Sequence, residues 1–240
     1  MPFLDRREAG RRLVERLRAF RGPETVVLGL PCGGVPVAYE VATALRAPLD
    51  VAVVAELEVP GRPRLVFGAV AEGGVRVVDD EQLVRAFIGP AERARLEREA
   101  REAVLRRAAR FRSVRERLCL TGRTVVLVDD GVATGATARA ACLLARKRGA
   151  GRVVFAVPVG SCRPIRALSA HADNVICLET PALFHSIEQW YRTFDPVTEA
   201  TVGELLERAA DQLRTPPTQP IRLGHKPVGR DATLKRVLDN

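Results

Sequence analysis

The stretch VVLVDDGVATGAT (residues 125–137) joins a short apolar run to two adjacent aspartates and then to a loop of small residues. The apolar run is typical of a buried strand, and the residues from Thr134 onward are typical of a helix start. In an open parallel sheet, ligands bind beyond the carboxyl ends of the strands. Unpaired N–H groups, the helix dipole and small side chains together favour an anion at such a turn. The stretch therefore predicts a strand, a phosphate-binding turn and a helix.

The acidic pair Asp129–Asp130 restricts what this turn could bind. The loop lacks the Lys and the spacing of a P-loop, and it lacks the three glycines of a dinucleotide-binding fingerprint. Two carboxylates beside the turn would repel a bare phosphate, so the ligand should present neutral donors or a metal ion there. A ribose satisfies this requirement, because its hydroxyls can donate to the carboxylates while its 5′-phosphate reaches the turn.

Periodicity elsewhere in the chain alternates between strands and helices. Asp5, with Glu8 three residues later, predicts the start of an amphipathic helix. Apolar runs predict buried strands at 25–30, 50–55, 124–129, 152–159 and 174–179, and the segments between them predict helices at 35–45, 136–148 and 164–170. This alternation predicts an α/β fold, with a mostly parallel sheet flanked by helices on both faces.

An insertion separates the second strand from the strand that carries the acidic pair. Two apolar runs, 64–71 and 75–78, flank Glu72-Gly73-Gly74, which predicts a hairpin. A charged stretch at 90–112 keeps its apolar residues on one stripe, which predicts a long surface helix. We expect residues 1–213 to form one domain and the Pro-rich basic stretch 214–240 to be extended or disordered.

Composition narrows the class of protein. The N-terminus has no signal-like apolar region, and no apolar run reaches the roughly 20 residues that span a bilayer, so we expect a cytoplasmic protein without a membrane segment. The five cysteines are scattered and odd in number, which argues against a disulfide framework or a zinc site. The net charge of +9 lies mostly in residues 1–21 and 214–240, each of which carries +4. The nearly neutral middle does not favour nucleic acid as the partner.

The stretch 125–137 resembles the signature of the type I phosphoribosyltransferases, which has apolar residues, two acids and a phosphate loop. The segments DRREAGRRL (5–13), GLPCGGVPVAYEVA (29–42), APLDVAVV (47–54), VFGAVAEGG (66–74), VPV (157–159) and WYRTF (190–194) are similar to a bacterial group of predicted phosphoribosyltransferases. The resemblance covers about residues 3–205. It implies a transferase and glycosyltransferase of nucleotide metabolism, whose donor is phosphoribosyl pyrophosphate (PRPP) with Mg²⁺.

The resemblance also implies roles for particular residues. Asp129 and Asp130 would hold the ribose hydroxyls and so carry the catalytic role. The 5′-phosphate would lie on Ala133, Thr134, Gly135, Ala136 and Thr137. The pyrophosphate loop would contain Cys32, Gly33 and Gly34. Mg²⁺ would bridge oxygens of the ligand, so we expect no metal site made by the protein alone.

Two departures from the related sequences bear on activity. The related group has Arg at the position of Cys32 and an Arg-Lys pair at Ala55-Glu56, and both positions would face the pyrophosphate. The missing cations predict slow turnover, unless Arg62, Arg64 or Arg163 replaces them. A degenerate binder of PRPP or a nucleotide, with a regulatory role and little turnover, is the alternative to the enzyme. A protein that binds nucleic acid through its basic ends is a third possibility.

The acceptor is not identified by the sequence. Ala133 stands where 6-oxopurine enzymes of this family carry an acid, which disfavours hypoxanthine and guanine. Trp190 and Tyr191 belong to an aromatic cluster that follows a strand end, and we consider them candidates for stacking on a base, with core packing as the simpler interpretation. The resemblance also implies a homodimer.

Overall fold

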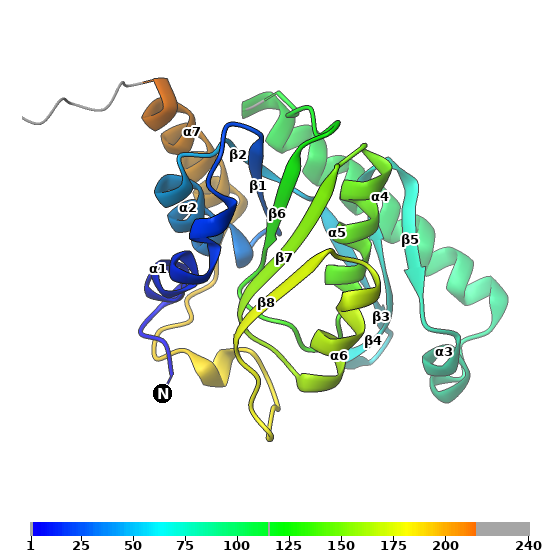
Figure 1. Ribbon diagram of the computed structural model, residues 1–240. Coiled ribbons are helices and arrows are strands. Elements are labelled where there is room, and N and C mark those ends of the chain that lie inside the picture. Colours follow the sequence, from blue (N-terminus) through cyan, green and yellow to red (C-terminus); the bar gives the residue numbers. More distant parts are fainter. Residues whose placement is uncertain (1, 115, 215–240) are drawn as a thin grey trace, which may run out of the picture.

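The computed structural model describes residues 2–114 and 116–214, and its elements alternate between strands and helices (Figure 1). The strands are β1 Thr25–Gly29, β2 Leu49–Val51, β3 Val54–Val59, β4 Arg62–Ala71, β5 Val75–Val78, β6 Thr124–Val128, β7 Arg152–Val159 and β8 Asn174–Glu179. The helices are α1 Arg6–Leu17, α2 Gly34–Leu45, α3 Asp80–Ala86, α4 Pro90–Val114, α5 Ala136–Lys147, α6 Cys162–Ala167 and α7 Glu199–Arg214. Short 3₁₀ turns are η1 Arg18–Phe20, η2 Glu72–Gly74, η3 Leu168–Ala170 and η4 Glu188–Trp190.

The central sheet has five parallel strands in the order β2-β1-β6-β7-β8. The strands β1 and β6 are direct neighbours, with Gly29 opposite Val128. Because parallel strands end at the same edge, the turn after β1 and the acidic pair after β6 must lie side by side.

Both faces of this sheet are covered. On one face, apolar residues of α1, α2 and α7 pack against the sheet together with the stripe Val104, Ala108 and Phe111 of α4. On the other face, α5 packs against the sheet, and the antiparallel sheet β3-β4-β5 lies against α5 (Figure 1). Helices therefore cover both faces, as predicted.

Most predicted elements were found within one or two residues of their expected bounds. Asp5 caps α1, since its carboxylate accepts a hydrogen bond of 2.7 Å from the N–H of Glu8. The hairpin turns at Gly73 and Gly74, whose φ angles of 71° and 74° favour glycine. The helix α7 was not predicted.

One strand prediction was wrong. The run 50–55 was expected to be a single strand, but it divides into β2 and β3, which belong to different sheets. Val51 pairs with Gly29 in the parallel sheet, whereas Val54 pairs with Ala71 in the antiparallel one. An unbroken apolar run cannot show where the chain changes partners.

The start of the chain lies against a segment from near its end. The N–H of Phe3 donates to the carbonyl of Trp190 at 2.7 Å, and the N–H of Arg192 donates to the carbonyl of Phe3 at 2.8 Å. The Phe3 ring is 5.5 Å from that of Tyr191. The predicted tail lies outside the described residues, apart from Arg214 at the end of α7.

Candidate functional site

Two loops meet at the carboxyl edge of the parallel sheet. An added Cβ at Gly33 would lie 2.1 Å from Asp130 Oδ2, and one at Gly34 would lie 2.7 Å from the carbonyl oxygen of Val128 and 2.9 Å from Asp129 Oδ1. No side chain could be placed at either position without moving the acidic loop. The glycines are therefore required by this close approach, and the predicted pyrophosphate loop does touch the acidic pair.

Asp129 is the acid without a cation partner among the contacts of the described residues. Its Oδ1 accepts a hydrogen bond of 2.9 Å from the N–H of Asp130. Burial and the neighbouring charge of Asp130 raise the pKa of Asp129 well above its ordinary value. A ligand that brings hydroxyl donors or a cation would stabilise the ionised carboxylate.

Asp130, by contrast, is held by an arginine that the sequence interpretation missed. Arg6 Nε lies 2.8 Å from Asp130 Oδ2, and both side chains are 11% exposed. The Arg6 guanidinium also donates to the carbonyl of Asp195 at 2.8 Å and lies 3.7 Å from the centre of the Phe194 ring. The α1 helix thus supplies a fixed positive charge to the acidic pair. A basic residue in an amphipathic helix gave no signal that could have identified this role.

The loop after the acids forms a small concave surface. Ala133 and Thr134 are exposed, and Gly135 has a φ of 82°, a conformation that favours glycine. Ala136 begins α5, and no acidic side chain lies in its first turn. A cavity of about 80 Å³ is lined by Glu56, Asp129, Ile187 and most of residues 131–138. Asp129 and the predicted phosphate loop therefore share one cavity.

Glu56 lies elsewhere than expected. From the sequence we expected Glu56 to face the pyrophosphate. In the structure its carboxylate accepts a hydrogen bond of 2.9 Å from the Thr137 hydroxyl. Burial raises the pKa of Glu56 above its ordinary value. A carboxylate therefore lines the cavity where the 5′-phosphate was predicted.

Cys32 is half-buried and packs against the core cluster that includes α2 and α7. Burial raises the pKa of its thiol, while the charge of Arg107 partly lowers it. Arg107 lies on α4 and is paired with Glu199 at 3.1 Å. The charge of Arg107, on the long helix α4 of the insertion, thus acts on the turn where the related sequences carry an arginine.

The three arginines considered as replacements have different positions. Arg62 is exposed at the start of β4, in the hairpin. Arg163 lies on α6 and lines a separate cavity beyond the phosphate loop. The side chain of Arg64 lies outside the described part of the structure.

The aromatic candidates differ from each other. Tyr191 is 6% exposed, its hydroxyl donates to the carbonyl of Asp130 at 2.6 Å, and burial raises its pKa. This side chain supports the acidic loop and has little free surface for stacking. Trp190 is partly exposed and packs at the edge of the same cluster. Ile187, which was not singled out, lies closer to the site, since a Cβ added to Gly131 would be 2.7 Å from its Cγ2.

Two negative findings apply to residues 2–114 and 116–214. No helix there is long and apolar enough to span a membrane. The same residues contain no group of three or more His, Cys, Asp or Glu side chains that could hold a metal ion.

Comparisons with known proteins agree with this geometry. A family model described as "Phosphoribosyl transferase domain" matches residues 5–192. A Mycobacterium tuberculosis protein named "Putative phosphoribosyl transferase Rv0571c" is 50% identical over 207 residues, which cover 86% of this chain and 47% of that protein. The chain therefore spans about half the length of the curated relatives it matches. The crystal structure of TT1426 from Thermus thermophilus has a TM-score of 0.72 and 41% identity, covering 87% of this chain and 99% of that chain. The predicted fold class is confirmed.

Proposed function

The chain belongs to the phosphoribosyl transferase domain family, and from this premise we propose that it transfers phosphoribose from PRPP to a nitrogenous base or related acceptor. The observation that carries the proposal is the single cavity lined by both Asp129 and the small-residue loop 131–137. One ligand that has hydroxyls next to a phosphate group can use both parts of this cavity at once.

We assign each part of the donor to one part of the site. The ribose hydroxyls donate to the carboxylates of Asp129 and Asp130, and the 5′-phosphate accepts from the N–H groups and hydroxyls of residues 133–137. The pyrophosphate lies along the loop of Gly33 and Gly34, which packs closely against the acidic pair. Arg6 donates to Asp130 Oδ2 and so fixes the orientation of this carboxylate.

The acidic pair also suits a magnesium ion that arrives with the donor. Carboxylate oxygens are ligands that Mg²⁺ prefers, and Asp129 is a buried acid whose raised pKa reflects uncompensated charge. We assign Asp129 as the residue that would hold the ion, directly or through water. The ion would supply positive charge for the pyrophosphate, and the protein would provide few ligands of its own.

The reaction breaks the bond between C1 of ribose and pyrophosphate, and the electron pair leaves with pyrophosphate. A lone pair of the acceptor nitrogen forms the new bond at C1 with inversion, and the acceptor gives up a proton. Such a reaction depends mainly on orientation and on stabilising the leaving group. Arg107 is our candidate for this stabilisation, because its charge acts at Cys32 beside the glycine turn. Its salt bridge to Glu199 would have to open.

An alternative function is a binder that recognises PRPP or a nucleotide with little turnover. The observation in its favour is Glu56, a carboxylate in the cavity where the 5′-phosphate would bind. Labelled PRPP, incubated with a panel of bases and followed by mass spectrometry, separates the two functions. A phosphoribosylated product with equimolar pyrophosphate supports the enzyme, and tight binding without product for any base supports the sensor.

Calorimetry with PRPP and Mg²⁺ tests the site itself. Charge-assisted hydrogen bonds contribute about 1.5 to 3 kcal/mol each, so Asp129→Asn and Asp130→Asn should weaken binding about tenfold or more. Glu24→Gln removes an acid whose side chain is 74% exposed and serves as the control. Equal affinity in all four proteins would contradict the proposal.

The leaving-group role has its own matched pair of variants. Arg107→Gln should lower kcat about tenfold or more, because it removes a charge-assisted contact to pyrophosphate. Arg106→Gln changes the neighbouring residue, whose side chain is 70% exposed, and should leave kcat unchanged. Loss of activity in Arg62→Gln instead would identify the hairpin arginine as the replacement.

We also propose that the protein forms a homodimer, as the resemblance implies. Light scattering on the full chain and on residues 1–220 tests this, and both should have the mass of a dimer. A monomeric full chain would contradict it.

A further inference from the structure

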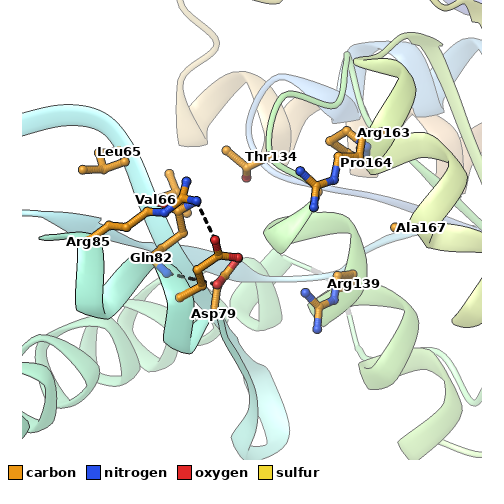
Figure 2. Close-up of a pocket in the computed structure, with 12 residues that line it drawn as sticks. Leu65, Val66, Asp79, Gln82, Arg85, Thr134, Arg139, Arg163, Pro164 and Ala167 are labelled. Atoms are coloured by element: carbon orange, nitrogen blue, oxygen red, sulfur yellow. Dashed lines mark hydrogen bonds and ion pairs between the residues drawn. The ribbon is translucent and has the colours of Figure 1, made fainter.

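A second, larger cavity lies on the far side of the phosphate loop. It has a volume of about 410 Å³ and lies between β4 and α3 on one side and α5 and α6 on the other (Figure 2). This volume is within the range of about 300 to 1,000 Å³ that is typical of small-molecule sites. Thr134 and Gly135 line both this cavity and the smaller one that contains Asp129. The two cavities thus share a wall, and the function proposed above uses only one of them.

Three arginines surround the second cavity. Figure 2 shows Arg139 and Arg163 along one wall, with Arg85 across the opening. Arg85 is paired with Glu81, one helical turn away. Neither Arg139 nor Arg163 has an ion pair or a side-chain hydrogen bond among the contacts of the described residues. Two guanidinium groups therefore have their donors available to a ligand.

The position of Arg139 lowers stability rather than raising it. It lies in the first turn of α5, where the helix dipole disfavours a cation. Its Nε is buried and has no hydrogen-bond partner within residues 2–114 and 116–214. A buried donor without a partner carries a desolvation penalty. Burial and the charge of Arg139 lower the pKa of His171 nearby.

The acidic residues of the cavity do not neutralise these two arginines. The Asp79 carboxylate accepts a hydrogen bond of 3.1 Å from the N–H of Gln82 and caps α3. Glu81 is paired with Arg85. The wall formed by α5 and α6 therefore remains positively charged, while Leu65, Val66, Pro164 and Ala167 provide apolar surface beside it.

We propose that this cavity binds a small molecule in which an oligophosphate is joined to a flat, largely apolar body, the chemistry of a nucleoside di- or triphosphate. Guanidinium groups match phosphate oxygens in a bidentate way, and two of them suit two phosphoryl groups. The Thr134 hydroxyl adds a donor at the shared wall. The apolar residues, which include Leu65 and Pro164, would contact the base. This site adjoins the PRPP site at Thr134 and Gly135, and it does not depend on the proposed transfer reaction.

Calorimetry with ATP tests the proposal on the full chain. Arg139→Gln and Arg163→Gln should each weaken ATP binding about tenfold or more. Arg166→Gln, on the same helix as Arg163 and with the same change of charge, does not line the cavity and should bind ATP within about twofold of the wild type. Equal weakening in Arg163→Gln and Arg166→Gln would overturn the site in favour of general charge attraction.

Further measurements separate this cavity from its neighbour and from a folding defect. Thr137→Val alters only the smaller cavity, so it should weaken PRPP binding and leave ATP binding unchanged. Loss of ATP binding in Thr137→Val would overturn the proposal, because ATP would then lie on the phosphate loop. Thermal unfolding should show that Arg139→Gln is at least as stable as the wild type. Equal affinity for inorganic tripolyphosphate and ATP would overturn the assignment of the apolar wall to a base.

Discussion

Two buried acidic pairs lie toward opposite ends of α5 and differ in how well their charge is neutralised. Asp129 and Asp130 precede the helix and have one cation between them, Arg6. Asp50 and Glu72, which are 0% and 3% exposed, lie toward the other end, beside the residues that follow the helix. Their partners are three arginines, Arg112, Arg117 and Arg148.

The second pair has more partners, although Glu72 Oε1, Arg112 Nε and Arg148 Nη1 are buried without a hydrogen-bond partner among the described residues. Asp50 accepts from Arg112 Nη1 at 2.6 Å and from the N–H of Leu118 at 3.1 Å. Glu72 accepts from Arg117 Nη2 at 2.5 Å. Burial lowers the pKa of Arg148, and the charges of Glu72 and Asp50 oppose that shift. Asp50 is thus surrounded by donors, whereas Asp129 has no cation partner among the contacts of the described residues.

Among the variants that test this comparison, Asp50→Asn should have the largest effect on stability. Removing one partner of a buried ion pair costs about 3 to 5 kcal/mol, because the remaining charge stays buried without compensation. We expect that loss in the free energy of unfolding, measured by urea denaturation. Asp129→Asn is the matched variant and should cost nothing. If both variants lose the same stability, the distinction between the two pairs is wrong.

Arg6→Gln should have the next largest effect, a loss of about 2 to 3 kcal/mol, since the pair with Asp130 is nearly buried. The variant leaves Asp130 beside Asp129 with no cation. The loss should be much smaller in an Asp130→Asn background, where the charge that Arg6 neutralises is absent. Arg18→Gln is the control, because Arg18 and Glu15 form an exposed pair. An equal loss in the Asp130→Asn background would mean that Arg6 acts through packing on Phe194.

Substitution of Asp129 should have the opposite effect on stability, an increase. Its pKa is raised in the folded state, so the native protein binds more protons than the unfolded chain, and stability falls as pH rises from about 4 through the folded pKa. Asp129→Asn removes this dependence and should be more stable than the wild type at pH 7 by about 1 kcal/mol, the repulsion of two nearby charges. Unfolding at pH 4 and pH 7 measures the difference, which should vanish at the lower pH. A variant that is less stable at pH 7 would contradict the uncompensated charge.

The smallest effect concerns Glu56. Glu56→Gln removes a negative charge beside Thr137 and should raise the affinity for PRPP about two- to fivefold at pH 7. Burial raises the pKa of Glu56, so the advantage should fall as pH is lowered and the wild-type carboxyl becomes protonated. Glu58→Gln changes the next outward-facing acid of β3 and serves as the control. Unchanged affinity would mean that Glu56 turns away when the donor binds.

Local pattern was enough to predict most of the fold and the place of the acidic loop at the end of its strand. The acids and the loop that begins α5 directly follow strand 124–128 in the sequence. Their place at the end of that strand could therefore be predicted from the sequence alone. The meeting of Gly33 with Asp130 followed from the rule that parallel strands end at one edge.

The features that sequence did not reveal come from segments far apart in the chain. Arg6 and Asp130 are separated by 124 positions, and Glu56 and Thr137 by 81. Arg107 comes from the insertion and acts on Cys32. Each is a charged residue on an otherwise ordinary amphipathic element, so periodicity assigned it to the surface.

The pairing of Phe3 with the segment around Tyr191 has a consequence for synthesis on the ribosome. Residues 2–6 are made about 190 residues before the carbonyls of Trp190 and Asp195 that hold them. At 5 to 20 residues per second, Arg6 waits roughly 10 to 40 s for its full set of partners. A nascent chain can therefore form the sheet and the acidic loop before Arg6 makes its contact with the carbonyl of Asp195. A substrate could stabilise the form in which these contacts are made only after the residues up to about Asp195 have left the exit tunnel of the ribosome.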